Sequence, residues 1–106
     1  RRVYIATMQP FGAEGQARIA RHRKMRAAKK FSTIECYTNL KEVELEPGSD
    51  VLLECMSNLT ANEIFDPSGA GKARAEEEIL AGVSRLAHQA RNLVLVTNEI
   101  FWTDTI

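Results

Sequence analysis

A histidine surrounded by cations is the part of this sequence with the clearest chemical potential. His22 lies between Arg21 and Arg23, and residues 18–30 hold seven lysines and arginines and no acid. Flanking positive charge disfavours a protonated imidazole, so we expect the ring to stay neutral near pH 7. A neutral ring nitrogen can attack an α-phosphorus, and the arginines and Lys24 would neutralise the phosphates and a departing pyrophosphate. The cluster therefore predicts a nucleophile or a phosphate site.

Other interpretations of the same stretch stay open. His22 could be a solvated helical histidine, whereas a metal site is poorly supported because no cysteine, histidine or acid stands at ligand spacing. The basic stretch could also bind a nucleic acid backbone, but no aromatic residue is interleaved with the arginines, so stacking on bases is unsupported. His88 lies on an ordinary amphipathic segment and is expected at the surface.

Acids at the ends of expected strands are the second chemical feature. Glu54 follows the apolar run 51–53, and Glu35 lies near the end of another strand-like stretch. An apolar strand that ends in an acid is the pattern by which nucleotide-binding α/β proteins present a carboxylate to Mg²⁺ or to a ribose. For Glu54 the alternative is a solvated acid at a strand end. Residues 7–9 and 97–99 also fall at expected strand ends, where ligands of such sheets gather.

Residues 66–73 contain a near match to a phosphate-binding loop. That motif needs Gly-x-x-x-x-Gly-Lys-Ser/Thr after a strand. Here Asp66 occupies the first glycine position, Ala73 replaces the hydroxyl that binds Mg²⁺, and a helical stretch precedes the segment. We therefore interpret the segment as a flexible loop and not as a phosphate site.

The elements that must position these residues alternate along the chain. Turn-forming residues fall at 9–12, 46–50 and 66–71, and Asn39 is placed to cap a short helix. We expect strands at residues 3–7, 31–37, 51–53 and 92–98, the last fully buried, and helices at residues 14–30, 40–43, 58–65 and 72–89. This order predicts a single α/β domain over residues 1–106, with a doubly wound, mostly parallel sheet and helices on both faces.

Composition places few restrictions on this picture. The 106 residues carry 14 basic and 14 acidic side chains, but residues 35–54 hold six acids and one lysine, so the charge is unevenly distributed. Cys36 and Cys55 sit in apolar runs without a C-x-x-C motif, which favours two buried free thiols in a reducing compartment. With no secretory signal and no membrane-length apolar run, we expect a cytoplasmic protein.

Four ordered blocks resemble a known family. They are Tyr4-Ile5-Ala6-Thr7-x-Gln9, then Arg18-Ile19-x-x-His22, then Leu52-Leu53-Glu54-Cys55 with Asn62 seven residues on, and finally Val94-Leu95-Val96-Thr97-Asn98-Glu99. Together they resemble the bifunctional adenosylcobinamide kinase/adenosylcobinamide-phosphate guanylyltransferases of cobalamin biosynthesis. The resemblance implies phosphorylation of adenosylcobinamide by a nucleoside triphosphate, followed by transfer of GMP from GTP, through a guanylylated histidine, to give adenosylcobinamide-GDP.

The resemblance also assigns roles to individual residues. It implies that His22 is the guanylylated histidine and that Glu54 is a nucleotide-binding acid, with Mg²⁺ as the metal through which it would act. Glu35 corresponds to a second such acid, although its alignment needs one inserted residue after His22. The remaining implied nucleotide contacts are Ala6, Thr7, Met8, Arg23, Lys24, Met25 and Arg26.

At the level of the whole protein, the resemblance implies a RecA-like P-loop NTPase fold, GTP or ATP with Mg²⁺, and assembly as a homo-trimer. The family's glycine-rich loop is expected before Arg1, and roughly the last third of a family member is expected after Ile106. After Glu99 the chain departs from the family pattern. The fold is thus expected to be incomplete at both ends and inactive alone. A non-catalytic nucleotide-binding relative and a basic-helix module for nucleic acid are the alternatives.

Overall fold

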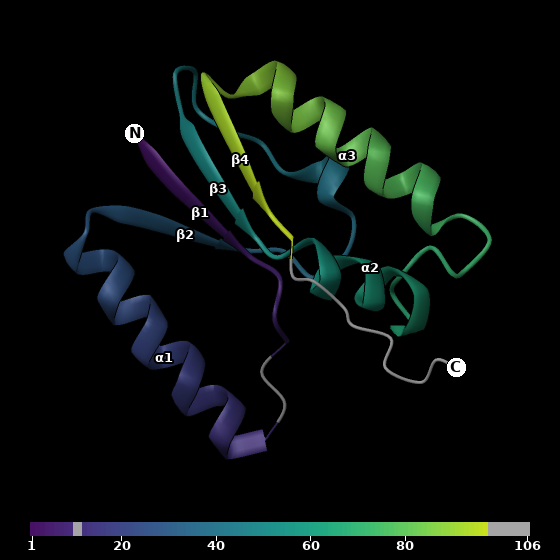
Figure 1. The fold of residues 1–106 in the computed structure, drawn as a ribbon, viewed down its shortest axis with the longest axis horizontal. Helices are drawn as coiled ribbons and strands as arrows, with labels where there is room; N and C mark the ends of the chain where they lie inside the picture. Colours follow the sequence, from purple (N-terminus) through teal and green to yellow (C-terminus); the bar gives the residue numbers. More distant parts are fainter. Residues whose placement is uncertain (10–11, 98–106) are drawn as a thin grey trace.

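The computed structural model describes residues 1–9 and 12–97, which form an alternating α/β arrangement (Figure 1). The order of the elements is the one predicted from the sequence. They are β1 (Arg2–Ala6), α1 (Gly12–Ala28), β2 (Phe31–Glu35), the 3-10 helix η1 (Leu40–Glu42), β3 (Asp50–Glu54), α2 (Met56–Phe65), α3 (Ala75–Gln89) and β4 (Asn92–Val96).

The four strands form one fully parallel sheet in the order β2-β1-β3-β4. Apolar and β-branched residues dominate the strands, as a pleated and partly covered surface requires. Side chains alternate between the two faces. Val3 and Ile5 of β1 therefore share one face with Val51 and Leu53 of β3, and all four are buried.

Helices lie on both faces of this sheet, as predicted. Figure 1 shows α1 on one side of the strands and α3 on the other. The buried core joins strand residues to η1, α2 and α3 and consists mainly of Val3, Ile5, Leu40, Val51, Leu53, Leu59, Ile79 and Leu86. On the opposite face the basic helix α1 packs against β2, and its described side chains are mostly exposed. The single core is consistent with the predicted α/β class, and α1 is free to present its cations to a ligand.

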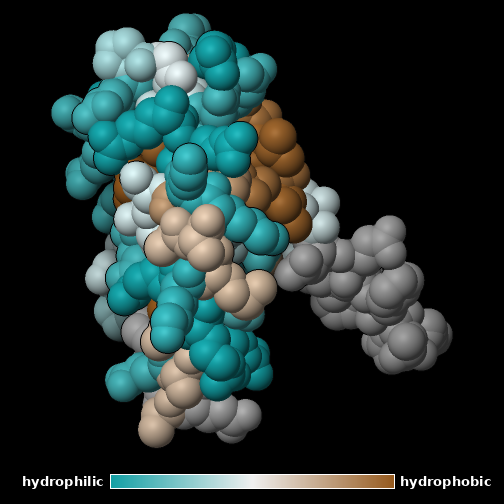
Figure 2. Space-filling model, turned by 90° about the vertical axis from the view of Figure 1, so that its left-hand side faces the viewer, coloured by the Kyte–Doolittle hydropathy of each residue, from teal (hydrophilic) through white to brown (hydrophobic). Residues whose placement is uncertain are grey.

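The prediction that the last strand is fully buried is wrong. Val94 is 57% exposed and Leu95 is 36% exposed. β4 is an edge strand of the described sheet, and Val94 lies on the face where α1 packs against β2 at the opposite edge. Figure 2 shows an exposed apolar area on one side of the molecule, in keeping with these values. An apolar sequence run indicates a strand, but it does not say how many neighbours cover that strand. Asn98, which the prediction placed in this strand, lies outside the described residues.

Element boundaries differ from the predictions by a few residues. The helix expected from residue 72 begins at Ala75, after Gly71 with a φ of 85°. The strand expected over residues 31–37 ends at Glu35, and the helix expected from residue 58 begins at Met56. Asn39 occupies the N-cap position of η1 but makes no side-chain capping hydrogen bond. Its left-handed backbone instead turns its N–H toward Glu63, which accepts that hydrogen bond at 2.9 Å.

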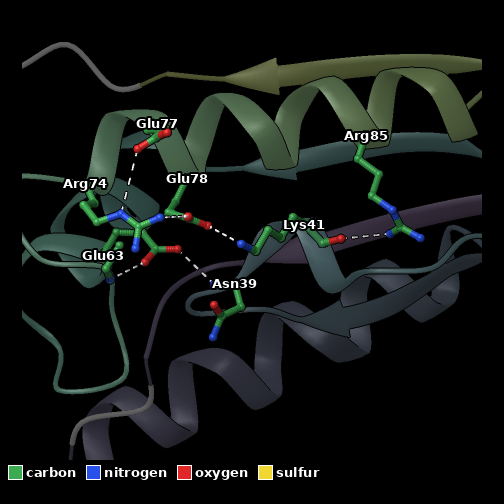
Figure 3. Close-up of polar contacts among 8 residues, drawn as sticks. Asn39, Lys41, Glu63, Arg74, Glu77, Glu78 and Arg85 are labelled. Carbon is green, nitrogen blue, oxygen red and sulfur yellow. Dashed lines mark hydrogen bonds and ion pairs between the residues drawn. The ribbon is translucent and has the colours of Figure 1, made fainter.

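Polar contacts fasten α2, α3 and η1 together (Figure 3). Glu63 is only 2% exposed, and its carboxylate accepts hydrogen bonds from the backbone N–H groups of Asn39 and Ala70, each at 2.9 Å. Glu78 on α3 pairs with Lys41 of η1 at 2.7 Å and with Arg74 at 3.1 Å. These contacts fix the loop between α2 and α3.

Both cysteines are buried thiols outside any disulfide in the described structure, as the sequence indicated. Burial raises the pKa of the Cys36 thiol to about 11, and the nearby carboxylates of Glu63 and Glu42 act in the same direction. No helix among residues 1–9 and 12–97 is long and apolar enough to span a membrane.

Candidate active site

Two adjoining cavities, of about 110 and 150 Å³, lie between α1 and the carboxyl ends of β1 and β3. Four residues line both of them: Tyr4, His22, Arg26 and Glu54. The first cavity is completed by Ala6, Met8, Ile19, Cys55 and Asn58, and the second by Met25 and Lys29. The histidine, an arginine and a strand-end acid that the sequence singled out therefore share one concave site.

Strand register and helix spacing explain why these residues meet. Ala6 is the register partner of Glu54, so β1 and β3 end side by side. On α1, Ile19, His22 and Arg26 are separated by three and four residues, which places them on one face of the helix. That face is turned to the sheet, because all three residues line the cavities. The edge of the sheet where the strands end is also where ligands of parallel α/β folds bind.

Tyr4 joins the acid to the arginine. Its hydroxyl donates a hydrogen bond to Glu54 Oε1 at 2.9 Å, and the guanidinium carbon of Arg26 lies 3.8 Å from the centre of its ring. Burial, and then the hydrogen bond to Glu54, raises the pKa of Tyr4 to about 12. Tyr4 is therefore a neutral donor near pH 7, and its ring provides the face that cation–π contact requires.

Thr7 stabilises the junction of β1 and β3 from inside. It is fully buried, and its hydroxyl accepts the Cys55 N–H at 2.8 Å while lying 2.9 Å from the Cys55 carbonyl. The Thr7 carbonyl accepts a hydrogen bond from Asn62 Nδ2 on α2 at 2.8 Å. Next along the chain, Gln9 donates to Asp66 at 2.7 Å. These bonds hold the end of β1, where the family resemblance implies contacts with a nucleotide. Thr7 itself does not line either cavity.

The structure brings most of the predicted site residues together, but not all of them. Six line the cavities: Ala6, Met8, His22, Met25, Arg26 and Glu54. Arg23 forms an ion pair with Glu35, so these two candidates contact each other beside the site. Glu35 lines a separate, shallower depression at the end of β2. Lys24 is exposed and, like Thr7, lies outside the lining of both cavities.

Sequence reasoning missed five lining residues: Tyr4, Ile19, Lys29, Cys55 and Asn58. Tyr4 stands in the expected strand at residues 3–7 and in the first family block, and alternation along β1 places it on the same face as Ala6. Ile19 had a signal of its own, because it stands one helical turn before His22. Asn58 follows Glu54 by four residues, and no pattern in the sequence distinguished it from other helix residues.

In the loop that resembles a phosphate-binding motif, the backbone N–H groups already have acceptors within the protein. The backbone N–H groups of residues 68–71 donate to oxygen atoms of Asp66 and Glu63, at 2.8 or 2.9 Å. A phosphate cradle needs such N–H groups to be free. The segment is a loop, as predicted, but these contacts fix it, in contrast to the flexible loop that the sequence led us to expect.

One carboxylate in the cavity has the chemistry that Mg²⁺ prefers. Among the described residues, Glu54 Oε1 is bonded by Tyr4, and no partner is found for Oε2. The same part of the chain contains no group of three or more His, Cys, Asp or Glu side chains able to hold a metal ion. Mg²⁺ is commonly held by one or two carboxylates together with substrate phosphates. Glu54 therefore fits a nucleotide-borne Mg²⁺ better than a resident metal.

Comparison with known proteins decides the family. The model of the cobinamide kinase / cobinamide phosphate guanyltransferase family matches residues 1–105. The chain belongs to this family. Its α/β sheet accordingly has the P-loop NTPase fold of the cobinamide kinase / cobinamide phosphate guanyltransferases, which confirms the predicted fold class.

Two curated relatives agree with this assignment. The chain is 32% identical to the bifunctional adenosylcobalamin biosynthesis protein CobU of Escherichia coli (strain K12), over 92% of the chain. It has the same identity and coverage to the protein of that name from Salmonella typhimurium (strain LT2). The match covers 61% of each relative, so the chain spans about three fifths of their length.

Proposed function

We propose that the protein takes part in cobalamin biosynthesis by phosphorylating adenosylcobinamide and then transferring GMP from GTP to the resulting phosphate. His22 is the proposed carrier of GMP. The observation that supports this most directly is that His22 shares one cavity with Arg26 and Glu54. Family membership supports the reaction class, and the cavity supports the assignment of the residue.

The guanylyl transfer would take place in two displacements. The lone pair of a ring nitrogen of His22 attacks the α-phosphorus of GTP, the bond from that phosphorus to the bridging oxygen breaks, and pyrophosphate leaves with the electron pair. A phosphate oxygen of adenosylcobinamide-phosphate then attacks the same phosphorus, and the nitrogen–phosphorus bond breaks. The products are adenosylcobinamide-GDP and the free histidine.

The surrounding side chains would supply charge and orientation. Arg26 and Lys29 are the described cations that line the cavities. Arg26 is the nearer of the two to His22 along α1, so it would contact the phosphates. Preorganised cations around a reacting phosphate stabilise charge that develops as the bond to the leaving group breaks. Arg23 and Lys24 would add to the positive field on α1. Glu54 would bind either the ribose or a Mg²⁺ ion that the nucleotide carries.

The kinase step requires a phosphate-binding loop and its lysine. Residues 68–71 do not supply that loop, because their backbone N–H groups are already bonded. We therefore assign phosphorylation of adenosylcobinamide, with GTP or ATP as donor, to the whole protein and not to the cavity at His22. The homo-trimer expected from the family resemblance is part of the same proposal.

The test is intact-mass spectrometry of the natural gene product after incubation with GTP and Mg²⁺. We expect an acid-labile GMP adduct whose peptide contains His22, since histidine phosphoramidates hydrolyse in acid. His22→Ala should remove the adduct and retain much of the kinase reaction. His88→Ala is the matched control, because His88 is an exposed helical histidine outside the cavity, and it should leave the adduct unchanged. An adduct that persists in a folded His22→Ala protein would contradict the proposal.

A further inference from the structure

Tyr4 contacts two of the candidate nucleotide-binding side chains at once. Its hydroxyl reaches Glu54 at 2.9 Å, and its ring lies under the guanidinium of Arg26 at 3.8 Å. The three residues come from β1, β3 and α1, so the contacts cross the whole site. Tyr4 is 7% exposed and lines both cavities.

We propose that Tyr4 is a positioning residue that holds Glu54 and Arg26 in the geometry needed to bind the nucleotide. The inference rests on the proposed function of this cavity and adds a role for a residue whose type gave no chemical signal. Tyr4 would act through its two neighbours and would itself remain unchanged in the reaction.

The hydrogen bond to Glu54 restricts which carboxylate oxygen is available. Oε1 accepts the tyrosine hydroxyl, and among the described residues Oε2 is left for an incoming ligand. An exposed glutamate otherwise samples several rotamers, and ordering it when the ligand binds costs conformational entropy. Because Tyr4 orders the carboxylate in advance, part of that cost falls on folding instead of on nucleotide binding.

The Tyr4 ring likewise orders the guanidinium of Arg26 before the nucleotide binds. Phe31 packs edge-on against the Tyr4 ring, with centroids 6.5 Å apart and planes at 85°, so the ring is held from the strand side. The guanidinium carbon of Arg26 lies 3.8 Å from the centre of the same ring, and its Nε lies 3.4 Å from the Thr33 hydroxyl. A guanidinium fixed in this way keeps its remaining N–H groups for bidentate contact with phosphate oxygens.

Tyr4→Phe in the natural gene product separates the hydroxyl from the ring. The phenyl ring keeps the contact with Arg26 and loses only the bond to Glu54. Since the hydroxyl orders the Glu54 side chain before the nucleotide binds, losing it returns that ordering cost to binding, and we expect GTP affinity to fall by up to about tenfold. The turnover number of guanylyl transfer at saturating GTP should change much less. Thr60→Val, which removes an exposed hydroxyl that bonds within α2 outside the cavities, is the control and should leave both quantities unaltered.

A double-mutant cycle with Glu54→Gln tests whether Tyr4 acts through the carboxylate. If it does, Tyr4→Phe should have little further effect on GTP affinity when Glu54→Gln is already present. A purely structural tyrosine would reduce thermal stability to a similar extent in both backgrounds and leave the affinity of the folded protein unchanged. Independent, multiplying effects of the two substitutions on GTP affinity would overturn the inference.

The remaining outcomes are also decisive. If the wild-type protein binds GTP and forms the adduct while Tyr4→Phe binds GTP equally well, the positioning role fails and the proposed function stands. If the folded wild-type protein neither binds GTP nor forms the adduct, both fail. Should Tyr4→Phe not fold, Glu54→Asp withdraws the carboxylate from the tyrosine hydroxyl by one methylene and keeps its charge. Unchanged GTP affinity in Glu54→Asp would likewise overturn the inference.

Discussion

At the scale of single residues, the buried carboxylate of Glu63 is the polar group on which the loop between α2 and α3 most depends. Both its oxygen atoms accept backbone N–H groups, one from Asn39 and one from Ala70, while its own carbonyl accepts the N–H of Gly71 (Figure 3). Gly69 packs so closely on this turn of α2 that an added Cβ would lie 2.4 Å from the Glu63 carbonyl oxygen. One acid thus orders two loops that come from distant parts of the chain.

Glu63→Gln should destabilise the protein by about 1–3 kcal/mol, because an amide has one acceptor oxygen and its NH₂ group would face a second donor. Urea unfolding monitored by circular dichroism measures the change. Glu77→Gln is the matched control, since the Glu77 carboxylate is exposed and its one described partner is Arg74 at 3.8 Å. The control should change stability by less than about 1 kcal/mol. Equal losses in the two variants would show that burial and bonding of Glu63 are not the cause.

At the scale of elements, β3 and β4 are joined at their first residues by a charged clamp. The Asp50 carboxylate accepts hydrogen bonds from Arg91 Nη2 at 2.6 Å and from Asn92 Nδ2 at 2.8 Å. The Arg91 backbone N–H also donates to the Ser49 carbonyl at 2.8 Å. The hydrogen bond from Arg91, followed by that from Asn92, lowers the pKa of Asp50 from 3.8 to about 2.

This clamp predicts a pH-dependent part of the stability. Because the pKa of Asp50 is lower in the folded protein than in the unfolded chain, its contribution is present above about pH 4 and disappears as the pH falls toward 2. Asp50→Asn should therefore be less stable than the wild type at pH 7, and the difference should narrow between pH 4 and pH 2. Thermal unfolding of both proteins across this range measures it. A difference that stays constant down to pH 2 would argue against the ionised clamp.

At the scale of helices and strands, sequence patterns predict most of this fold. Strand type, helix type and element order follow from local periodicity and turn residues, so β1, α1 and β3 were found close to their observed bounds. The coverage of β4 was not predictable in this way, because exposure of Val94 depends on which elements flank the strand in space. The start of α3 was misplaced for a local reason, the positive φ of Gly71, which the sequence permits but does not require.

The residues of the candidate site were likewise predictable only where a local sequence pattern marked them. His22 and Glu54 were predicted from their charge surroundings and strand-end position, and both line one cavity. The ion pair between Arg23 and Glu35 and the contact of Tyr4 with Glu54 depend on side-chain reach between elements, which periodicity does not describe. Sequence reasoning therefore singled out the charged candidates and not the tyrosine that contacts two of them.

At the scale of the whole molecule, balanced charge conceals a separation of cations from acids. Residues 18–30 place seven cations on and just after α1, whereas six acids fall within residues 35–54. In the folded chain Glu35 meets Arg23, and Glu54 lies across the cavity from Arg26. Arg23 is the one cation of residues 18–30 with a described ion pair, and most of the others are exposed along α1. The cavity beside His22 suits a compact anion such as a nucleoside triphosphate, whereas an exposed row of cations suits an extended phosphate backbone.

A competition experiment separates these two ligands. A fluorescent GTP analogue should bind the natural gene product at 150 mM salt, and random-sequence DNA should not displace it. Arg26→Gln should weaken binding of the analogue, whereas Lys30→Gln, at an exposed cation outside the cavities, should leave it nearly unchanged. A nucleic acid surface would behave differently: DNA would displace the analogue, both substitutions would weaken DNA binding, and affinity for DNA would fall by about 10³–10⁵ between 50 and 200 mM salt if six to ten phosphates were contacted. That result would assign the basic helix α1 to nucleic acid binding instead of guanylyl transfer.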